Sequence, residues 1–190
     1  MIRRVSIESL PRLCAGRDTA EQTWKRRPLW LAVQNVLAFT LDQMPAECRR
    51  GLEEQAKALQ ADYETVFPLL DRACEATCPW CPTPCCFVAD ARFDFKDMLF
   101  IHLARVPVPL GQPRGDGHAV CRYLGPSGCL LPRTSRPWIC TWYLCPMQKQ
   151  WFFTYDEAGY RQLGKATDSI KKQRKELELQ YVRVLTPARE

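Results

Sequence analysis

The sequence lacks an apolar run long enough to cross a membrane. Its longest apolar stretch, residues 29–41, is interrupted by Gln34, Asn35 and Thr40, whereas a membrane-spanning helix needs about 20 consecutive apolar residues. The first residues, MIRRVSIESLPRLCAGRD, are basic but contain no apolar segment of the kind that directs secretion. We therefore expect a cytoplasmic protein without a membrane span.

Histidine and familiar catalytic motifs are also scarce. The 190 residues include two histidines, and they contain no Ser-centred elbow, phosphate-binding glycine loop or paired-histidine helix. The sequence therefore carries no hydrolase signature and indicates no substrate. The net charge of +6 and the isoelectric point near 8.8 are mild for a nucleic-acid binder. We expect a protein partner rather than nucleic acid.

Cysteine is the residue in excess. Eleven cysteines occur in 190 residues, and nine of them lie between Cys74 and Cys145. In a reducing compartment such a cluster is more typical of thiolate ligands than of disulfides. The first segment reads Cys74-x3-Cys78-x2-Cys81-x3-Cys85-Cys86, and the second reads Cys121-x7-Cys129-x10-Cys140-x4-Cys145.

These two segments predict a metal centre with cysteine ligands. The two residues between Cys78 and Cys81 let both sulfurs turn toward one point. Four ligands per site are expected for zinc or for a cubane cluster, so the cysteines suffice for two sites, or for one site with spare thiols. Whether Cys74 is a ligand, and whether Cys85 and Cys86 both bind, is left open. The predicted ligands are Cys78, Cys81, Cys85, Cys86, Cys121, Cys129, Cys140 and Cys145.

The residue types around the cysteines favour an iron–sulfur cluster over zinc. Ligation by cysteine alone suits a cluster, whereas zinc sites often include histidine. Arg122, Arg133 and Arg136 lie in the second segment. Their positive charges are expected to lower thiol pKa values and to offset the negative charge of a thiolate-bound cluster.

Four further potential ligands are interpreted separately. Cys14 and Cys48 have no ligand-spaced partner in the sequence, so we interpret them as buried apolar cysteines. His102 falls on an apolar helical stripe and is interpreted as a core residue. His118 precedes Cys121 by three residues in a glycine-rich stretch, and we keep it as a second-rank ligand.

Outside the cysteine segments, apolar residues recur at helical spacing. This pattern predicts helices over residues 28–43, 45–75, 94–105, 146–156 and 164–184, with a kink at Pro68. Prolines in residues 76–90 predict an irregular loop without regular helix, and one short strand pair is expected near Cys121 and Cys129. The predicted fold class is mainly α, with helices flanking an irregular proline- and cysteine-rich core. We divide one compact domain into residues 1–73, 74–146 and 147–190.

Part of the cysteine pattern resembles a known family. Cys78-x2-Cys81-x3-Cys85-Cys86, followed by CRYLGPSGCLLPRTSRPWIC over residues 121–140, resembles the YkgJ-like cysteine-cluster family of zinc- or iron-chelating domains. The match covers about residues 74–146 and departs by one extra residue before the cysteine pair and by the added Cys74 and Cys145. The resemblance implies metal or cluster binding and defines no reaction.

Two main functions explain the cysteines. The favoured one is a metal-binding protein that holds an iron–sulfur cluster in a redox role or in the service of a partner enzyme. The alternative is a structural zinc module that folds a protein-interaction surface. Cys74-x3-Cys78-x2-Cys81 also fits the loop of radical S-adenosylmethionine enzymes. We place that function third, because the loop follows a long helical pattern instead of the first strand of an α/β barrel.

Overall fold

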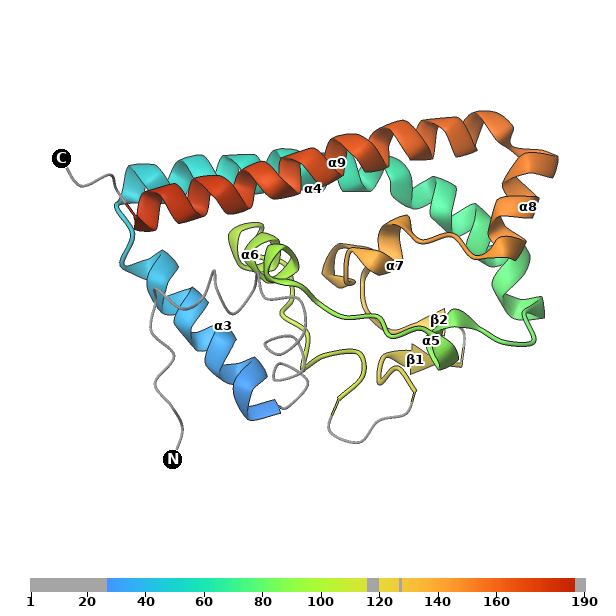
Figure 1. Ribbon diagram of the computed structural model, residues 1–190, viewed down its shortest axis with the longest axis horizontal. Coiled ribbons are helices and arrows are strands. Elements are labelled where there is room, and N and C mark those ends of the chain that lie inside the picture. The colour runs from blue at the N-terminus through green and yellow to red at the C-terminus, as the bar shows by residue number, and fades with distance from the viewer. Residues whose placement is uncertain (1–26, 116–119, 127, 187–190) are drawn as a thin grey trace.

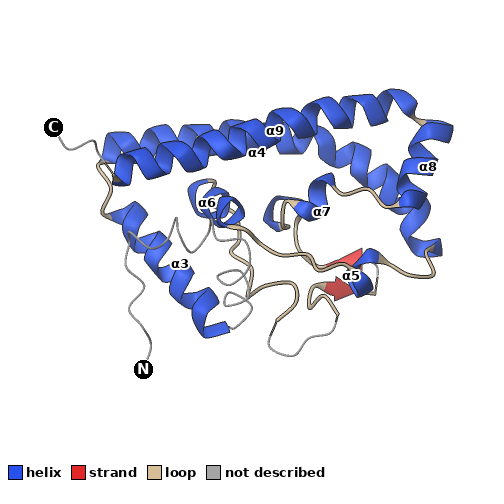
Figure 2. Ribbon diagram, viewed as in Figure 1, coloured by secondary structure: helices blue, strands red, loops and turns tan. Residues whose placement is uncertain are grey.

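The computed structural model describes residues 27–115, 120–126 and 128–186, and in them the protein is mainly α-helical, as predicted (Figure 2). The interpretations of Cys14 and His118 concern positions outside the described residues. The longer helices, with the predicted ranges in parentheses, are α3 Arg27–Asp42 (28–43), α4 Ala46–Thr77 (45–75), α6 Phe95–Leu103 (94–105), α8 Pro146–Tyr155 (146–156) and α9 Glu157–Leu185 (164–184).

Helices α4 and α9 lie side by side and form the long axis of the molecule (Figure 1). Each has one apolar stripe that the other helix and α6 cover, because apolar residues recur three or four positions apart. Pro68 lies inside α4, where it cannot donate the backbone hydrogen bond of that turn. The last part of α4 turns away from α9 toward α8 (Figure 1), as the predicted kink requires.

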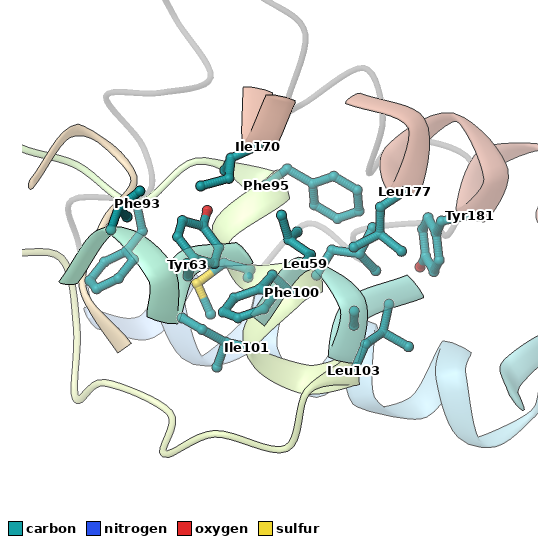
Figure 3. Close-up of a cluster of buried hydrophobic side chains, with 14 of the residues drawn as sticks. Leu59, Tyr63, Phe93, Phe95, Phe100, Ile101, Leu103, Ile170, Leu177 and Tyr181 are labelled. Atoms are coloured by element: carbon teal, nitrogen blue, oxygen red, sulfur yellow. The ribbon is translucent and has the colours of Figure 1, made fainter. Parts of the chain in front are cut away.

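The hydrophobic core lies where α4, α6 and α9 meet. Figure 3 shows Leu59 and Tyr63 of α4, Phe95 of α6, and Ile170 and Leu177 of α9 in one cluster. All five side chains are at most 5% exposed. Complete burial of a large apolar side chain contributes about 1.5–3 kcal/mol, so this cluster fixes α6 against the long helix pair.

Helix α3 covers another side of α6. Trp30 is buried, and its indole nitrogen donates to the carbonyl oxygen of Pro109 over 3.2 Å. Gln34 and His102 share a hydrogen bond of 2.5 Å between Oε1 and Nε2. His102 is half-buried, and its ring is held by the buried side chain of Gln34.

The cysteine segments contain more regular structure than predicted. The prediction that prolines exclude helix from residues 76–90 is wrong, because the segment forms η2, Cys78–Trp80, and α5, Cys85–Val88. Pro79 lies in the first turn of η2 and Pro84 directly precedes α5. A missing N–H costs little at such positions.

The second segment forms a short hairpin and two single-turn helices. Strands β1, Leu124–Gly125, and β2, Gly128–Cys129, are antiparallel, with Leu124 opposite Cys129. They form the strand pair expected near Cys121 and Cys129. After the hairpin come η3, Arg133–Ser135, and α7, Ile139–Trp142. No helix in the described ranges is both long and apolar enough to cross a membrane.

Candidate metal centre

All eight predicted ligands, and Cys74, lie in the described part of the chain as free thiols. The structure distributes most of them between two neighbourhoods. We call Cys86, Cys121, Cys129 and Cys140 the hairpin group, and we call Cys74, Cys78 and Cys145 the Gln148 group.

The hairpin group assembles around the β1–β2 turn. The backbone N–H of Cys121 donates to the carbonyl oxygen of Cys86 over 3.1 Å, which joins α5 to the hairpin. The pairing of β1 with β2 brings Cys129 back toward Cys121, and α7 supplies Cys140. Figure 1 shows α5 beside the two strands. Four thiols from three separate stretches of sequence therefore share one neighbourhood.

The thiols of the hairpin group influence one another electrostatically. Burial, followed by the charges of Cys129 and Cys121, raises the pKa of Cys140 to about 12. Burial and the charge of Cys129 also raise the pKa of Cys121. The pKa of Cys86 is raised mainly by its hydrogen bond to Cys85 and by burial, and also by the nearby Cys121 and Cys129. Neighbouring thiolates repel one another, so a bound cation would relieve that repulsion.

The Gln148 group assembles where the end of α4 meets the start of α8. The side-chain nitrogen of Gln148 donates to the sulfur of Cys74 over 3.2 Å and to that of Cys78 over 3.9 Å. The side-chain oxygen of Gln148 accepts from the backbone N–H of Cys145 over 3.2 Å, and its own backbone N–H contacts the sulfur of Cys145 at 3.5 Å. One buried glutamine thus contacts three cysteines.

The environment of Cys74 favours a thiolate. The hydrogen bond from Cys78 lowers the pKa of Cys74 to about 6, against the effect of burial, and the charges of Arg133 and Arg136 act in the same direction. Arg133 Nη2 lies 3.8 Å from the sulfur of Cys74 and also pairs with Asp71. The pKa of Cys78 is raised, mainly because its thiol donates to Cys74.

Cys85 lies between the two groups. A hydrogen bond from Cys86 lowers its pKa to about 6, against burial and the nearby charge of Cys74. Cys85 and Cys86 both lie on the single turn of α5. Successive residues of a helix are about 100° apart around its axis. Cys81 lies between η2 and α5 and is half-buried.

The three predicted arginines occupy different places. Arg133 contacts Cys74, and Arg136 donates to the carbonyl oxygen of Leu131. The charge of Arg122 acts to lower the pKa of Cys121, although burial dominates there. Arg122 and Arg133 thus approach different thiol groups.

A buried polar network, which the sequence pattern did not predict, holds the second cysteine segment against the helices. Arg174 of α9 is 2% exposed and lies 2.8 Å from Asp97 and 2.9 Å from Asp94. Asp97 accepts the backbone N–H of Trp138 over 3.0 Å, two residues before Cys140. Burial and the charge of Asp94 raise the pKa of Asp97 to about 7. The sequence does carry a signal for the two carboxylates of this network. Asp94 and Asp97 form an Asp-x-x-Asp pattern at a helix start, which is typical of reciprocal capping.

The cysteine thiols are ligands of the type that a soft metal prefers, but their positions in the structure do not form a complete metal site. Among the residues described, no three His, Cys, Asp or Glu side chains are arranged to hold one metal ion. Thiols suit zinc and iron–sulfur clusters, and the hairpin group supplies the four that one site needs. Binding would therefore require the thiol side chains to rotate and lose their protons.

Comparison of the chain with models of protein families, with curated proteins and with solved structures finds no match. The resemblance to the YkgJ-like family therefore remains a prediction from the cysteine motifs.

Proposed function

We propose that this protein binds an iron–sulfur cluster, in a redox role or in the service of a partner enzyme. Cys86, Cys121, Cys129 and Cys140 are the ligands that the geometry supports best. The observation that carries the proposal is the approach of four thiols from α5, the hairpin and α7, linked by the Cys121–Cys86 backbone hydrogen bond. In this proposal Cys78, Cys81, Cys85 and Cys145 remain candidate ligands of a second site.

The composition of the group supports a cluster more than zinc. All four donors are cysteines, as in most iron–sulfur proteins. Arg114 and Arg122 act on the Cys121 thiol in the direction that favours its ionised form. Positive charge near the ligands helps to stabilise a centre whose four thiolates make it negative. When bound, the cluster would supply one-electron redox chemistry.

Anaerobic purification followed by iron, zinc and acid-labile sulfide analysis tests the proposal. We expect iron and sulfide in the wild type, and loss of most of both in Cys121→Ser and Cys140→Ser. Cys48→Ser is the matched control, because Cys48 packs against the hydrophobic core away from both groups. Adding Cys78→Ser and Cys145→Ser shows whether the Gln148 group also contributes ligands.

A structural zinc module for protein interaction is the second candidate. Large apolar side chains are exposed around the cysteines: Trp80 is 78% exposed and Leu130 is 68% exposed, and Phe87 and Trp142 are also exposed. Such side chains are typical of contact surfaces when they gather. Stoichiometric zinc without acid-labile sulfide in colourless, anaerobically prepared protein would contradict the cluster and favour this module, because zinc itself has no redox chemistry.

A further inference from the structure

A small cavity lies where the second cysteine segment meets the long helices. Its volume is about 10 Å³, which is room for one water-sized group. Tyr63 of α4 and Phe100 and Ile101 of α6 line it, and Figure 3 shows these three side chains together. Residues of η3, of α7 and of the stretch between them contribute further lining. The cavity therefore lies between the hydrophobic core and the stretch that carries Cys140.

The lining of the cavity carries a net positive charge. Arg136 donates through Nε to a backbone carbonyl oxygen, which has no charge to balance it. The other guanidinium of the lining, that of Arg133, pairs with Asp71. Asp97, the carboxylate of the lining, lies 2.8 Å from Arg174 and is neutralised by it. The charge of Arg136 is therefore left to attract an anion.

Hydroxyl groups in the lining also have hydrogen atoms to donate. The hydroxyl of Tyr63 accepts from Arg174 Nη1 over 2.8 Å, and it keeps its own proton at neutral pH. In the described ranges, no group accepts the hydrogen of this hydroxyl or those of Thr134 and Thr141. Thr141 is only 4% exposed. A buried donor without an acceptor costs free energy, and an acceptor inside the cavity removes that cost.

We propose that this cavity binds a chloride ion. The guanidinium of Arg136 supplies the positive charge, and the hydroxyls of Tyr63 and Thr141 donate hydrogen bonds to the ion. The volume admits a monatomic anion, whereas phosphate, sulfate and carboxylate groups have too many atoms to enter it. A water molecule would satisfy the hydroxyls but would not balance the charge. This inference goes beyond the proposed cluster and does not require it.

The bound ion would lie between the two thiol groups. Arg133 lines the cavity and also contacts Cys74 of the Gln148 group. Thr141 directly follows Cys140 of the hairpin group. By joining donors of α4 and α7, the ion would hold the second cysteine segment against the long helices.

Thermal unfolding of the purified full chain tests the proposal. The protein is unfolded in sodium chloride and in sodium gluconate at the same ionic strength, because gluconate is too large for the cavity. Chloride at about five times its dissociation constant should raise Tm by about 2–4 °C, and the rise should grow only slowly at higher concentration. Equal Tm values in the two salts would overturn the proposal.

Variants of the lining locate the effect. Thr141→Val keeps the shape of the side chain and removes its hydroxyl, and Arg136→Gln removes the charge. Both substitutions should abolish the chloride-dependent rise in Tm. The matched controls Thr154→Val and Arg161→Gln should keep it, because both residues lie on exposed faces of α8 and α9. A rise that survives in Thr141→Val and Arg136→Gln would contradict the cavity as the binding site.

Chloride is also a ligand for metal ions, so its effect must be separated from the proposed cluster. The variant Cys121→Ser, which should lose most of the iron and sulfide, should keep the chloride-dependent rise in Tm. Loss of the rise in this variant would assign chloride to the metal and would overturn the proposal. Absence of iron and sulfide from the wild type would contradict the cluster alone.

Crystals grown in sodium bromide give a measurement that needs no variant. Anomalous scattering should show one bromide ion in the cavity, within hydrogen-bond distance of the hydroxyls of Tyr63 and Thr141. Density for a water molecule alone would overturn the proposal. Bromide in the cavity without chloride-dependent stabilisation in solution would also overturn it, because such binding occurs at crystal concentration only.

Discussion

At the scale of single residues, the guanidinium of Arg174 connects the helical frame to the second cysteine segment. It bonds Asp94, Asp97 and the hydroxyl of Tyr63, and its Cζ atom lies 5.2 Å from the ring centroid of Trp138. Asp97 in turn holds the backbone N–H of Trp138. Both terminal nitrogens of this buried cation therefore bond protein groups, and Asp97 is the buried carboxylate that it neutralises.

We predict that Arg174→Leu lowers the free energy of unfolding by about 3–5 kcal/mol, because it leaves a buried carboxylate without its cation. Arg183→Leu is the control on the same helix. Its ion pair with Glu176 is exposed, and such pairs contribute about 0–1 kcal/mol. Urea denaturation followed by circular dichroism measures both changes. Equal losses in the two variants would show that the network is not a main source of stability.

The sequence predicted which residue types form the candidate site, but it could not predict that the cysteines divide into the hairpin group and the Gln148 group. Spacing identifies thiols that are able to bind metal, and it does not say which thiols meet after the chain turns back on itself. The Gln148 group depends on the meeting of α4 and α8, which are 70 residues apart at Cys78 and Gln148. A local signal did exist, since Gln148 stands three residues after Cys145 in the position of a capping-box glutamine.

At the scale of elements, periodicity predicted the long helices to within a few residues, with one exception. Helix α9 begins at Glu157, seven residues before the predicted start. Two glycines, Gly159 and Gly164, weaken the helical pattern there. The cap supplied by Asp156 compensates, because its side chain accepts the backbone N–H of Gly159 over 2.9 Å and pairs with Arg72 of α4 over 2.7 Å. The tertiary contact between Asp156 and Arg72 thus supports the start of α9 at Glu157, which local helix propensity does not favour.

Replacing each of the two glycines of α9 by alanine should change the stability of the protein in opposite directions. A Cβ at Gly159 would collide with the Asp156 carboxylate, whereas a Cβ at Gly164 meets nothing within 4 Å. We expect Gly164→Ala to stabilise the protein by about 0.5–1 kcal/mol, as alanine does in an exposed helix. Gly159→Ala should destabilise it instead, because the carboxylate must leave its capping position. Thermal unfolding of both variants measures the difference, and a gain in both would mean that the cap adapts without cost.

At the scale of the whole molecule, the helical frame and the cysteine segments differ in how they are held together. The buried apolar residues come mainly from α3, α4, α6 and α9. Within the described residues, the stretches 74–92 and 121–145 add Tyr123 and Leu144 to that core. Helix-forming patterns made the frame predictable, whereas the cysteine segments are held by turns, caps and polar contacts that join distant residues. Such contacts leave little periodic signal in a sequence.

This difference predicts what happens when the proposed metal is removed. Small metal-dependent modules unfold without their ion because they lack another core, but here the core is formed by helices that contain none of the hairpin group. We therefore expect a chelator to leave the helical circular dichroism nearly unchanged. Trypsin should meanwhile cut faster at Arg122 and Arg133, since residues 121–145 would lose the bonds that the metal supplies. Cys140→Ser without chelator should show the same cleavage pattern. Collapse of the helical signal together with metal loss would contradict the prediction and show that the centre stabilises the entire fold.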